Sequence, residues 1–262
     1  MKQQPRVSLR IALFAISVTS AALLALGCQA QRNWPFEAVE ASSPEAVIDI
    51  VRARARAINT LWARVQVEID SQKFSGAFDL ASIYKRPDSL HMVAFKGLLL
   101  SSRPIFELTF TGTEYRLVLY EEDSTTRTAG PSTRFTTDHP DLARLYWLRE
   151  LLFLAGECLP GAELSRAESG GPWTLDGETR DGARVRFRLE PKTLGVVAAA
   201  IEPPDDSGPV DVLYQDYEKV GDVYVPSRVE ASSRDRQFAM VAVVAELDVN
   251  VEIDDEVFVG QE

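Results

Sequence analysis

Apolar and polar side chains alternate with a period of two along most of this 262-residue chain, and that period favours a sheet that is buried on one face. Residues 63–69 alternate Ala, Val and Ile with Arg, Gln and Glu, and residues 106–111 alternate Phe and Leu with Glu and Thr. Similar patterns or short apolar runs predict further strands at 74–84, 90–95, 115–119, 173–179, 185–189, 194–201, 210–217, 223–232 and 238–249. The sequence therefore predicts about eleven strands.

The connections between these strands are short and rich in turn-forming residues. Thr111-Gly112-Thr113, Asp181-Gly182 and Gly221-Asp222 are typical turns. Strands this close in sequence are most simply joined as hairpins, so the sheet is predicted to be antiparallel. Only residues 121–137, which are polar and rich in Thr, are expected to form a long loop.

Two helices are predicted beside the strands. The first begins at the capping residue Ser43, with Pro44 in its first turn, and should be amphipathic over about four turns. Its apolar stripe comprises Val47, Val51, Ile58, Leu61 and Trp62, and its basic face comprises the arginines at 52, 54 and 56. The second helix, from about Pro140 to Leu154, is apolar nearly all round and is expected to be buried. The fold class is thus mostly β (α+β).

The amino terminus has the three parts of an export signal. Lys2, Arg6 and Arg10 provide positive charge, residues 11–26 form an uncharged and mostly apolar run, and Gly27-Cys28 ends it. The run is shorter than the roughly 20 apolar residues of a membrane-spanning helix. We predict a signal peptide at 1–27, a polar tether at 28–42 and one domain at 43–262.

Cys28 indicates which kind of export signal this is. Ala25-Leu26-Gly27-Cys28 resembles the lipobox of bacterial lipoproteins, which implies acylation of Cys28 and an anchor of several acyl chains. Gln29, in place of an Asp, implies location at the outer membrane facing the periplasm. The alternative is an ordinary cleaved signal that happens to contain a cysteine.

The charge of the remaining chain excludes one class of partner. Cleavage after Gly27 would remove three of the 28 basic residues and no acidic one, leaving 25 basic against 39 acidic residues, a net charge of −14. Such a surface repels phosphate backbones, so we expect no nucleic acid partner. With Cys28 acylated, Cys158 has no intrachain partner and is read as a small core residue rather than a reactive thiol.

The order of a helix, a run of antiparallel strands, a mid-chain helix and more strands resembles the LolA/LolB-like superfamily of lipoprotein carriers and receptors. Three stretches carry the resemblance: Lys85 to Leu90 with its Lys-Arg-Pro turn, Leu108 to Tyr120 with Gly112 at the turn, and Tyr214 to Val229 together with the ending Val249 to Phe258. The resemblance implies an incomplete antiparallel β-barrel covered by helices, with an apolar cavity that holds lipoprotein acyl chains. A lipid-anchored chain departs from the freely diffusing carriers and is closer to a receptor.

Two site predictions follow from this resemblance. Arg86 matches the arginine that ties the barrel rim to the covering helices by hydrogen bonds to backbone, a clasp that opens when lipid enters. The alternative is an exposed turn residue beside Pro87. Leu98, Leu99 and Leu100 stand where the receptors expose a membrane-contacting leucine; the alternative is that they extend a buried strand.

The acyl cavity is predicted to be lined by inward-facing apolar residues of the helix end and the first strands. These residues are Trp62, Phe78, Leu80, Phe106, Leu108, Phe110, Leu117 and Leu119. The same alternation also builds a barrel whose interior is filled by its own side chains, so the sequence leaves an open cavity and a filled core as alternatives.

Catalytic motifs are not found. The two histidines, His91 and His139, are far apart, and the acidic carboxyl-terminal residues lack the glycine and closing Glu of a calcium loop. We predict no enzyme, no cofactor and no metal. The functional hypothesis is a membrane-anchored lipoprotein that binds acyl chains or lipoproteins, and the alternative is a structural or partner-binding envelope lipoprotein.

Overall fold

The computed structural model describes residues 36–40, 43–71, 75–96, 103–139, 142, 163–166, 171–178, 182–204, 208–234 and 237–259. They belong to one compact unit, Pro35–Glu262. The signal peptide, Cys28, the three leucines at 98–100 and Cys158 lie outside the described residues, as does nearly all of the second predicted helix. None of the helices in the described ranges is long and apolar enough to cross a membrane.

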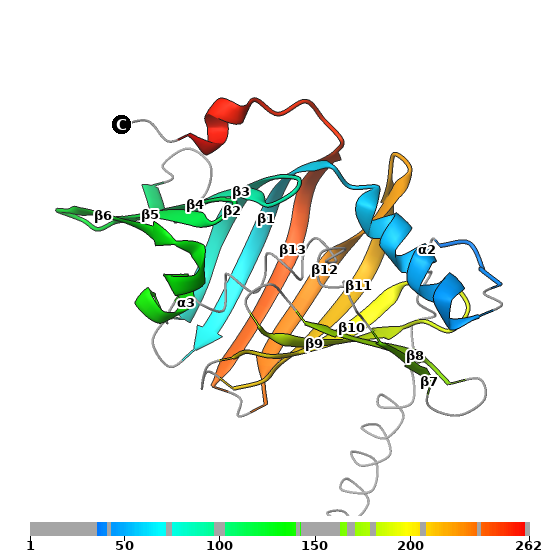
Figure 1. Ribbon diagram of the computed structural model, residues 1–262. Helices are drawn as coiled ribbons and strands as arrows, with labels where there is room; N and C mark the ends of the chain where they lie inside the picture. Colours follow the sequence, from blue (N-terminus) through cyan, green and yellow to red (C-terminus); the bar gives the residue numbers. More distant parts are fainter. Residues whose placement is uncertain are drawn as a thin grey trace, which may run out of the picture. The chain divides into compact units, whose positions relative to one another are not determined.

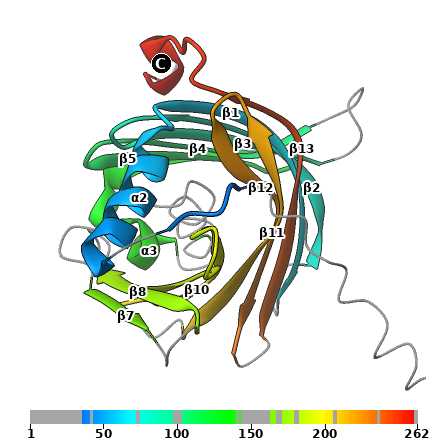
Figure 2. The same cartoon turned by 90° about the vertical axis from the view of Figure 1, so that its right-hand side faces the viewer.

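A single sheet contains every strand that the structure describes, thirteen in all, and each neighbouring pair is antiparallel (Figure 1). The strands are β1 (Thr60–Ser71), β2 (Ser75–Lys85), β3 (Ser89–Lys96), β4 (Arg103–Thr111), β5 (Glu114–Tyr120), β6 (Thr125–Pro131), β7 (Glu163–Arg166), β8 (Trp173–Glu178), β9 (Arg184–Leu189), β10 (Val196–Glu202), β11 (Val210–Val220), β12 (Val223–Ser233) and β13 (Phe238–Val249). Their order is β6-β5-β4-β3-β2-β1-β13-β12-β11-β10-β9-β8-β7, so the first and last strands of the chain meet in the middle. The sheet curls strongly but does not close, because β6 and β7 are its edges (Figure 2). The predicted incomplete antiparallel barrel is therefore confirmed.

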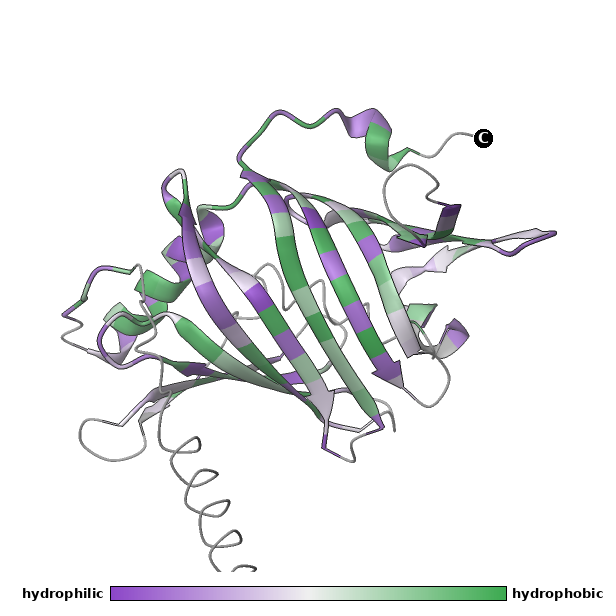
Figure 3. Ribbon diagram, turned by 180° about the vertical axis from the view of Figure 1, so that it is seen from behind, coloured by the Kyte–Doolittle hydropathy of each residue, from purple (hydrophilic) through white to green (hydrophobic). Residues whose placement is uncertain are grey.

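The concave face of this sheet is a continuous apolar layer. Residues paired across antiparallel strands point to the same face, and the register puts apolar side chains opposite one another from strand to strand. Across β1 to β4, for example, Val65 pairs with Leu80, Leu80 with Ala94 and Ala94 with Phe106, and all four are buried. The outer face carries the intervening polar residues, as the alternating hydropathy along the strands shows (Figure 3). One of its cross-strand pairs is the ion pair of Arg64 with Glu246, 2.9 Å apart.

Helix α2 (Pro44–Arg56) lies at the open side of the curled sheet (Figure 2). It starts where predicted, because the Ser43 hydroxyl accepts a hydrogen bond from Ala46 N and so caps the first turn. Val47, Val51 and Ala55 form its buried stripe. The prediction that Leu61 and Trp62 continue this stripe was wrong: both belong to β1, where successive side chains point to opposite faces.

The region expected to be a long loop contains further structure. Residues 125–131 form β6, an edge strand that is mostly exposed on both faces, so its sequence shows no apolar alternation. It is followed by the 3-10 turn η1 (Ser132–Arg134) and the short helix α3 (Phe135–Asp138), whose Phe135 is fully buried. A last 3-10 turn, η3 (Asp255–Phe258), follows β13 and contacts β3 and β4.

Candidate functional site: an apolar pocket with one arginine

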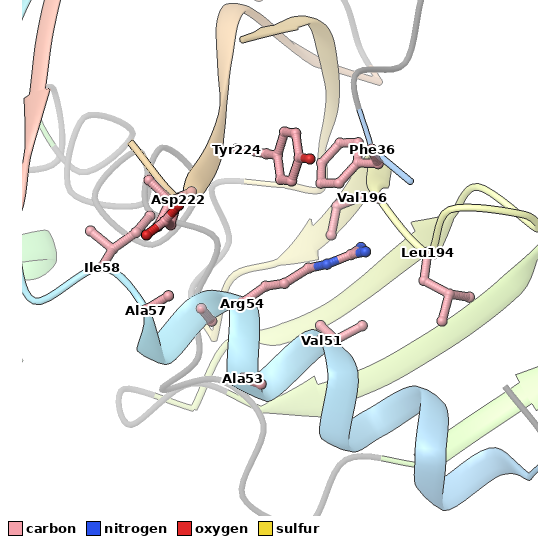
Figure 4. Close-up of a pocket in the computed structure, with 13 residues that line it drawn as sticks. Phe36, Val51, Ala53, Arg54, Ala57, Ile58, Leu194, Val196, Asp222 and Tyr224 are labelled. Atoms are coloured by element: carbon pink, nitrogen blue, oxygen red, sulfur yellow. The ribbon is translucent and has the colours of Figure 1, made fainter. Parts of the chain in front are cut away.

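A pocket of about 330 Å³ lies between α2, the turn before β10 and the tip of the β11–β12 hairpin (Figure 4). Its lining is mostly apolar. The lining residues are Phe36, Val51, Ala53, Arg54, Ala55, Ala57, Ile58, Leu194, Gly195, Val196, Asp222, Val223 and Tyr224. The volume is at the lower end of the range of small-molecule sites.

Arg54 is the cation of this pocket. Its Nη1 donates a hydrogen bond to the carbonyl oxygen of Thr193 over 2.7 Å, and its guanidinium carbon lies 4.8 Å from the centroid of the Phe36 ring. The side chain is half-buried, and desolvation lowers the pKa of Arg54 from its ordinary value, although the guanidinium stays charged at physiological pH. No carboxylate of the described residues forms an ion pair with it.

The Thr193 carbonyl is held toward Arg54 by a tight turn. One carboxylate oxygen of Glu190 accepts hydrogen bonds from Lys192 N, Thr193 N and the Thr193 hydroxyl at 2.9, 2.6 and 2.8 Å. Leu194 then adopts a positive φ of 55°, a conformation that non-glycine residues rarely take. This turn fixes the position of the carbonyl that Arg54 contacts.

Phe36 closes one side of the pocket from the chain segment that precedes α2. Its ring is 4.9 Å from the Tyr217 ring and 4.4 Å from the Tyr224 ring, centroid to centroid. Gly195 lies directly against it: a Cβ there would stand 2.9 Å from a Phe36 ring carbon. Tyr217 is itself fixed, since its hydroxyl donates to Val196 O over 2.8 Å, and burial raises its pKa.

The segment after Phe36 is attached at a second point, where Val39 N donates to Lys192 O over 2.8 Å. Part of the predicted polar tether, residues 28–42, thus packs on the domain at Phe36 and Val39.

Arg86, the predicted clasp, sits in the turn between β2 and β3 and contacts the end of α2. Its Nε donates to Ile58 O and its Nη2 donates to Ala55 O, both over 2.8 Å. Arg86 N also donates to Asn59 O over 2.8 Å. These bonds join the turn to the last turn of α2, at Ala55, and to Ile58 and Asn59, which follow the helix. That the clasp opens for a ligand stays a prediction.

The eight residues predicted to line the acyl cavity do not line the α2 pocket. Seven of them share the concave face, where the Phe78 and Phe106 rings are 6.3 Å apart and Leu108, Phe110 and Leu117 are fully buried. Trp62 is different: it alternates with the buried Leu61 and Ala63 and so points to the opposite face. The α2 pocket was not predicted because four segments that are far apart in the sequence build it, and no pattern within one segment indicates that they meet.

A second polar cluster joins β5 to α3. The Tyr115 hydroxyl lies 3.3 Å from both Asp138 Oδ2 and His139 Nε2, and Arg134 pairs with Asp138 at 3.1 Å. Phe135 stacks edge-on against Tyr115, so the cluster packs α3 on the sheet. Among the described residues, no group of three His, Cys, Asp or Glu side chains could hold a metal ion.

Comparison with solved structures identifies the fold. A LolA superfamily protein from Nitrosomonas europaea matches with a TM-score of 0.57 at 10% identity, over 83% of this chain and 98% of that one. A domain from Vibrio parahaemolyticus described as an outer membrane lipoprotein-sorting protein gives 0.57 at 9% identity, over 81% and 94%. A DUF1329 family protein from Desulfovibrio piger gives 0.54 at 12% identity, over 82% and 96%. No protein-family model and no curated protein matches the sequence.

At this level of identity the comparisons establish the fold alone. The chain has the half-barrel fold of the LolA superfamily, and the predicted LolA/LolB-like resemblance is confirmed as a likeness of fold.

Proposed function

We propose that this chain is a lipid-anchored protein of the bacterial envelope that binds a lipid acyl chain in the α2 pocket and takes part in receiving or sorting lipoproteins. The observation that carries the proposal is the pocket, whose walls are mostly alanine, valine, leucine and isoleucine side chains. Each methylene of an acyl chain gains about 0.8 kcal/mol on burial, so such a pocket needs few polar contacts to bind one.

Two further observations support this proposal. The Vibrio parahaemolyticus domain that shares the fold is described as a lipoprotein-sorting protein. The sequence Ala25 to Cys28 resembles a lipobox, and acylation there would keep the domain at a membrane surface. We infer a binding role rather than catalysis, with lipids or lipoproteins as partners.

The acyl-binding proposal is tested by lipid extraction and mass spectrometry of the full chain purified from bacterial envelopes. We expect bound lipid in the wild type and a several-fold lower load in Ala53→Trp, which puts a large ring into the pocket lining. Arg56→Trp, at a position of the same helix that is exposed like Ala53 but does not line the pocket, is the matched control and should keep its lipid. An empty wild type contradicts the proposal; equal loads in wild type and Ala53→Trp show that the pocket is not the site.

The anchor is tested separately by labelling cells with radioactive palmitate. The wild type should incorporate the label and sediment with membranes, whereas Cys28→Ser should do neither. Equal labelling of the two chains would remove Cys28 as the anchor.

One observation favours a second candidate, a structural or partner-binding envelope lipoprotein. Leu108, Phe110 and Leu117, predicted as cavity walls, have no exposed surface, as in a filled core. This candidate predicts that the lipid extraction above finds nothing in any variant.

A further inference from the structure

The two charged groups of the α2 pocket lie at different ends of it. Figure 4 shows the Arg54 side chain extending toward Phe36, Val196 and Leu194, whereas Asp222 lies beside Ile58 and Ala57. Asp222 is exposed at the tip of the β11–β12 hairpin and keeps its hydration. Arg54 is half-buried and lacks a carboxylate partner among the described residues. The pocket is thus polarised, with its cation inside and its acid at the solvent edge.

A guanidinium in this setting favours an anion. Arg54 offers five donors in a fixed fork, and its one hydrogen bond to a described residue goes to Thr193 O. Partial desolvation strengthens its attraction for a negative charge, since the effective dielectric constant there is lower than in water. Apolar side chains on α2 and β10 begin next to it, including Val51, Ala55 and Val196.

We propose that Arg54 forms a headgroup subsite for the anionic end of a single-chain amphiphile, such as the carboxylate of a fatty acid, whose hydrocarbon tail occupies the apolar remainder of the α2 pocket. This inference rests on the proposed acyl-binding function and adds the chemistry of the head. The ligand is bound at both ends: a charge-assisted hydrogen bond to the guanidinium fixes the head, and burial holds the tail.

The test is calorimetric titration of the purified full chain with two ligands that differ only in the charge of the head, decanoate and decanamide, below their aggregation concentrations. We expect decanoate to bind about tenfold or more tightly than decanamide, because a hydrogen bond to a charged partner is worth more than a neutral one. Acetate, the head without a tail, should show no measurable binding.

Variants on the same helix assign the effect to Arg54. Arg54→Met keeps the aliphatic stem and should lose about tenfold to a hundredfold in decanoate affinity. Its loss in decanamide affinity should be smaller, because the neutral amide makes the weaker hydrogen bond to the guanidinium. Arg54→Lys retains a charge and should lose less. Arg56→Met removes an exposed cation two residues further along the helix and should change neither affinity. Thermal unfolding of each variant checks that the fold is kept.

The outcomes separate this inference from the proposed function. Equal affinities for decanoate and decanamide, unchanged in Arg54→Met, would overturn the headgroup subsite and leave acyl binding standing. Binding of neither amphiphile would overturn both. Acetate binding as tightly as decanoate would mean a site for small free anions, which also contradicts an amphiphile site.

Discussion

Arg86 Nη2 lies 2.8 Å from the carbonyl oxygen of Ala55, a residue thirty-one positions earlier in the chain. The same guanidinium reaches Ile58 O through Nε at 2.8 Å. The turn between β2 and β3 therefore holds the carboxyl-terminal end of α2, and α2 forms one wall of the pocket.

Replacing Arg86 should weaken the attachment of α2. Arg86→Met removes both charge-assisted hydrogen bonds and leaves two backbone carbonyls without these donors, so we expect a loss of about 2–4 kcal/mol in the free energy of unfolding, measured with urea. Arg86→Lys, with one point charge, should recover only part of it. Arg56→Met is the control. If Arg86→Met is as stable as that control, the hydrogen bonds of Arg86 to α2 do not stabilise the fold.

The clasp hypothesis makes a separate kinetic prediction. If the contact must open for ligand exchange, Arg86→Lys should release a bound fluorescent fatty acid faster than the wild type, with a smaller change in its equilibrium affinity. An unchanged release rate would leave Arg86 a purely structural residue.

Gly195 should be intolerant of even one methyl group. A Cβ there would stand 2.9 Å from a Phe36 ring carbon. Gly195→Ala should therefore displace the ring and lower the free energy of unfolding by about 1–3 kcal/mol. The double variant Gly195→Ala with Phe36→Ala has no clash. In the Phe36→Ala background, Gly195→Ala should therefore lower the free energy of unfolding by at least about 1 kcal/mol less than it does in the wild type. Proteolysis of residues 36–40 and urea unfolding measure both effects; fully additive costs would show that the ring and the glycine do not interact.

His91 should make stability depend on pH. It lies half-buried in β3 with Nδ1 3.0 Å from the Thr109 hydroxyl, and burial lowers the pKa of His91, aided by Arg116 and opposed by Glu107. The unfolded chain, in which the histidine has its ordinary pKa of about 6.5, therefore binds the proton more readily than the folded chain. The stabilisation is present above that value and is lost as the pH falls through the lower pKa of the folded state.

The corresponding measurement is the free energy of unfolding between pH 8 and pH 5. The decline should be shallower in His91→Gln, whose amide still reaches Thr109 without titrating. Parallel curves for the two chains would exclude His91 as the source.

Membrane contact by the leucines at 98–100 remains a prediction from the sequence. Replacing all three with Ser should leave folding intact and reduce membrane contact or lipid delivery, because they would touch lipid rather than the core. Circular dichroism and vesicle flotation are the measurements. If the triple variant unfolds, the leucines extend the buried strand.

Sequence patterns predicted the sheet well because burial on one face produces the alternation from which strands are recognised. They failed for β6, since an edge strand exposed on both faces needs no apolar side chains, and its Thr-rich sequence resembled a loop. They also misassigned Leu61 and Trp62, whose spacing of three and four residues from Ile58 is that of one helix face, although both lie in β1.

The pocket was not predictable in the same way. Arg54 is one of three alternate arginines in α2, and nothing in the sequence distinguishes it from Arg52 or Arg56. Its distinction arises from the Thr193 turn, 139 residues away, which accepts its hydrogen bond. Contacts of this kind depend on how the curled sheet places the turn before β10 against α2, and local patterns carry no information about that.

The docking of Phe36 and Val39 also determines how the domain responds to mechanical force. A pull along the chain that precedes Phe36 reaches the folded unit at the rim of the pocket. There it acts on the contacts of Phe36 with the Tyr217 and Tyr224 rings and on the hydrogen bond of Val39 to Lys192. These attachments are local, whereas the β1–β13 seam shares any load over a whole ladder of paired residues. Tension on the amino terminus would therefore strip Phe36 from Arg54 and uncover that side of the pocket long before the sheet gave way.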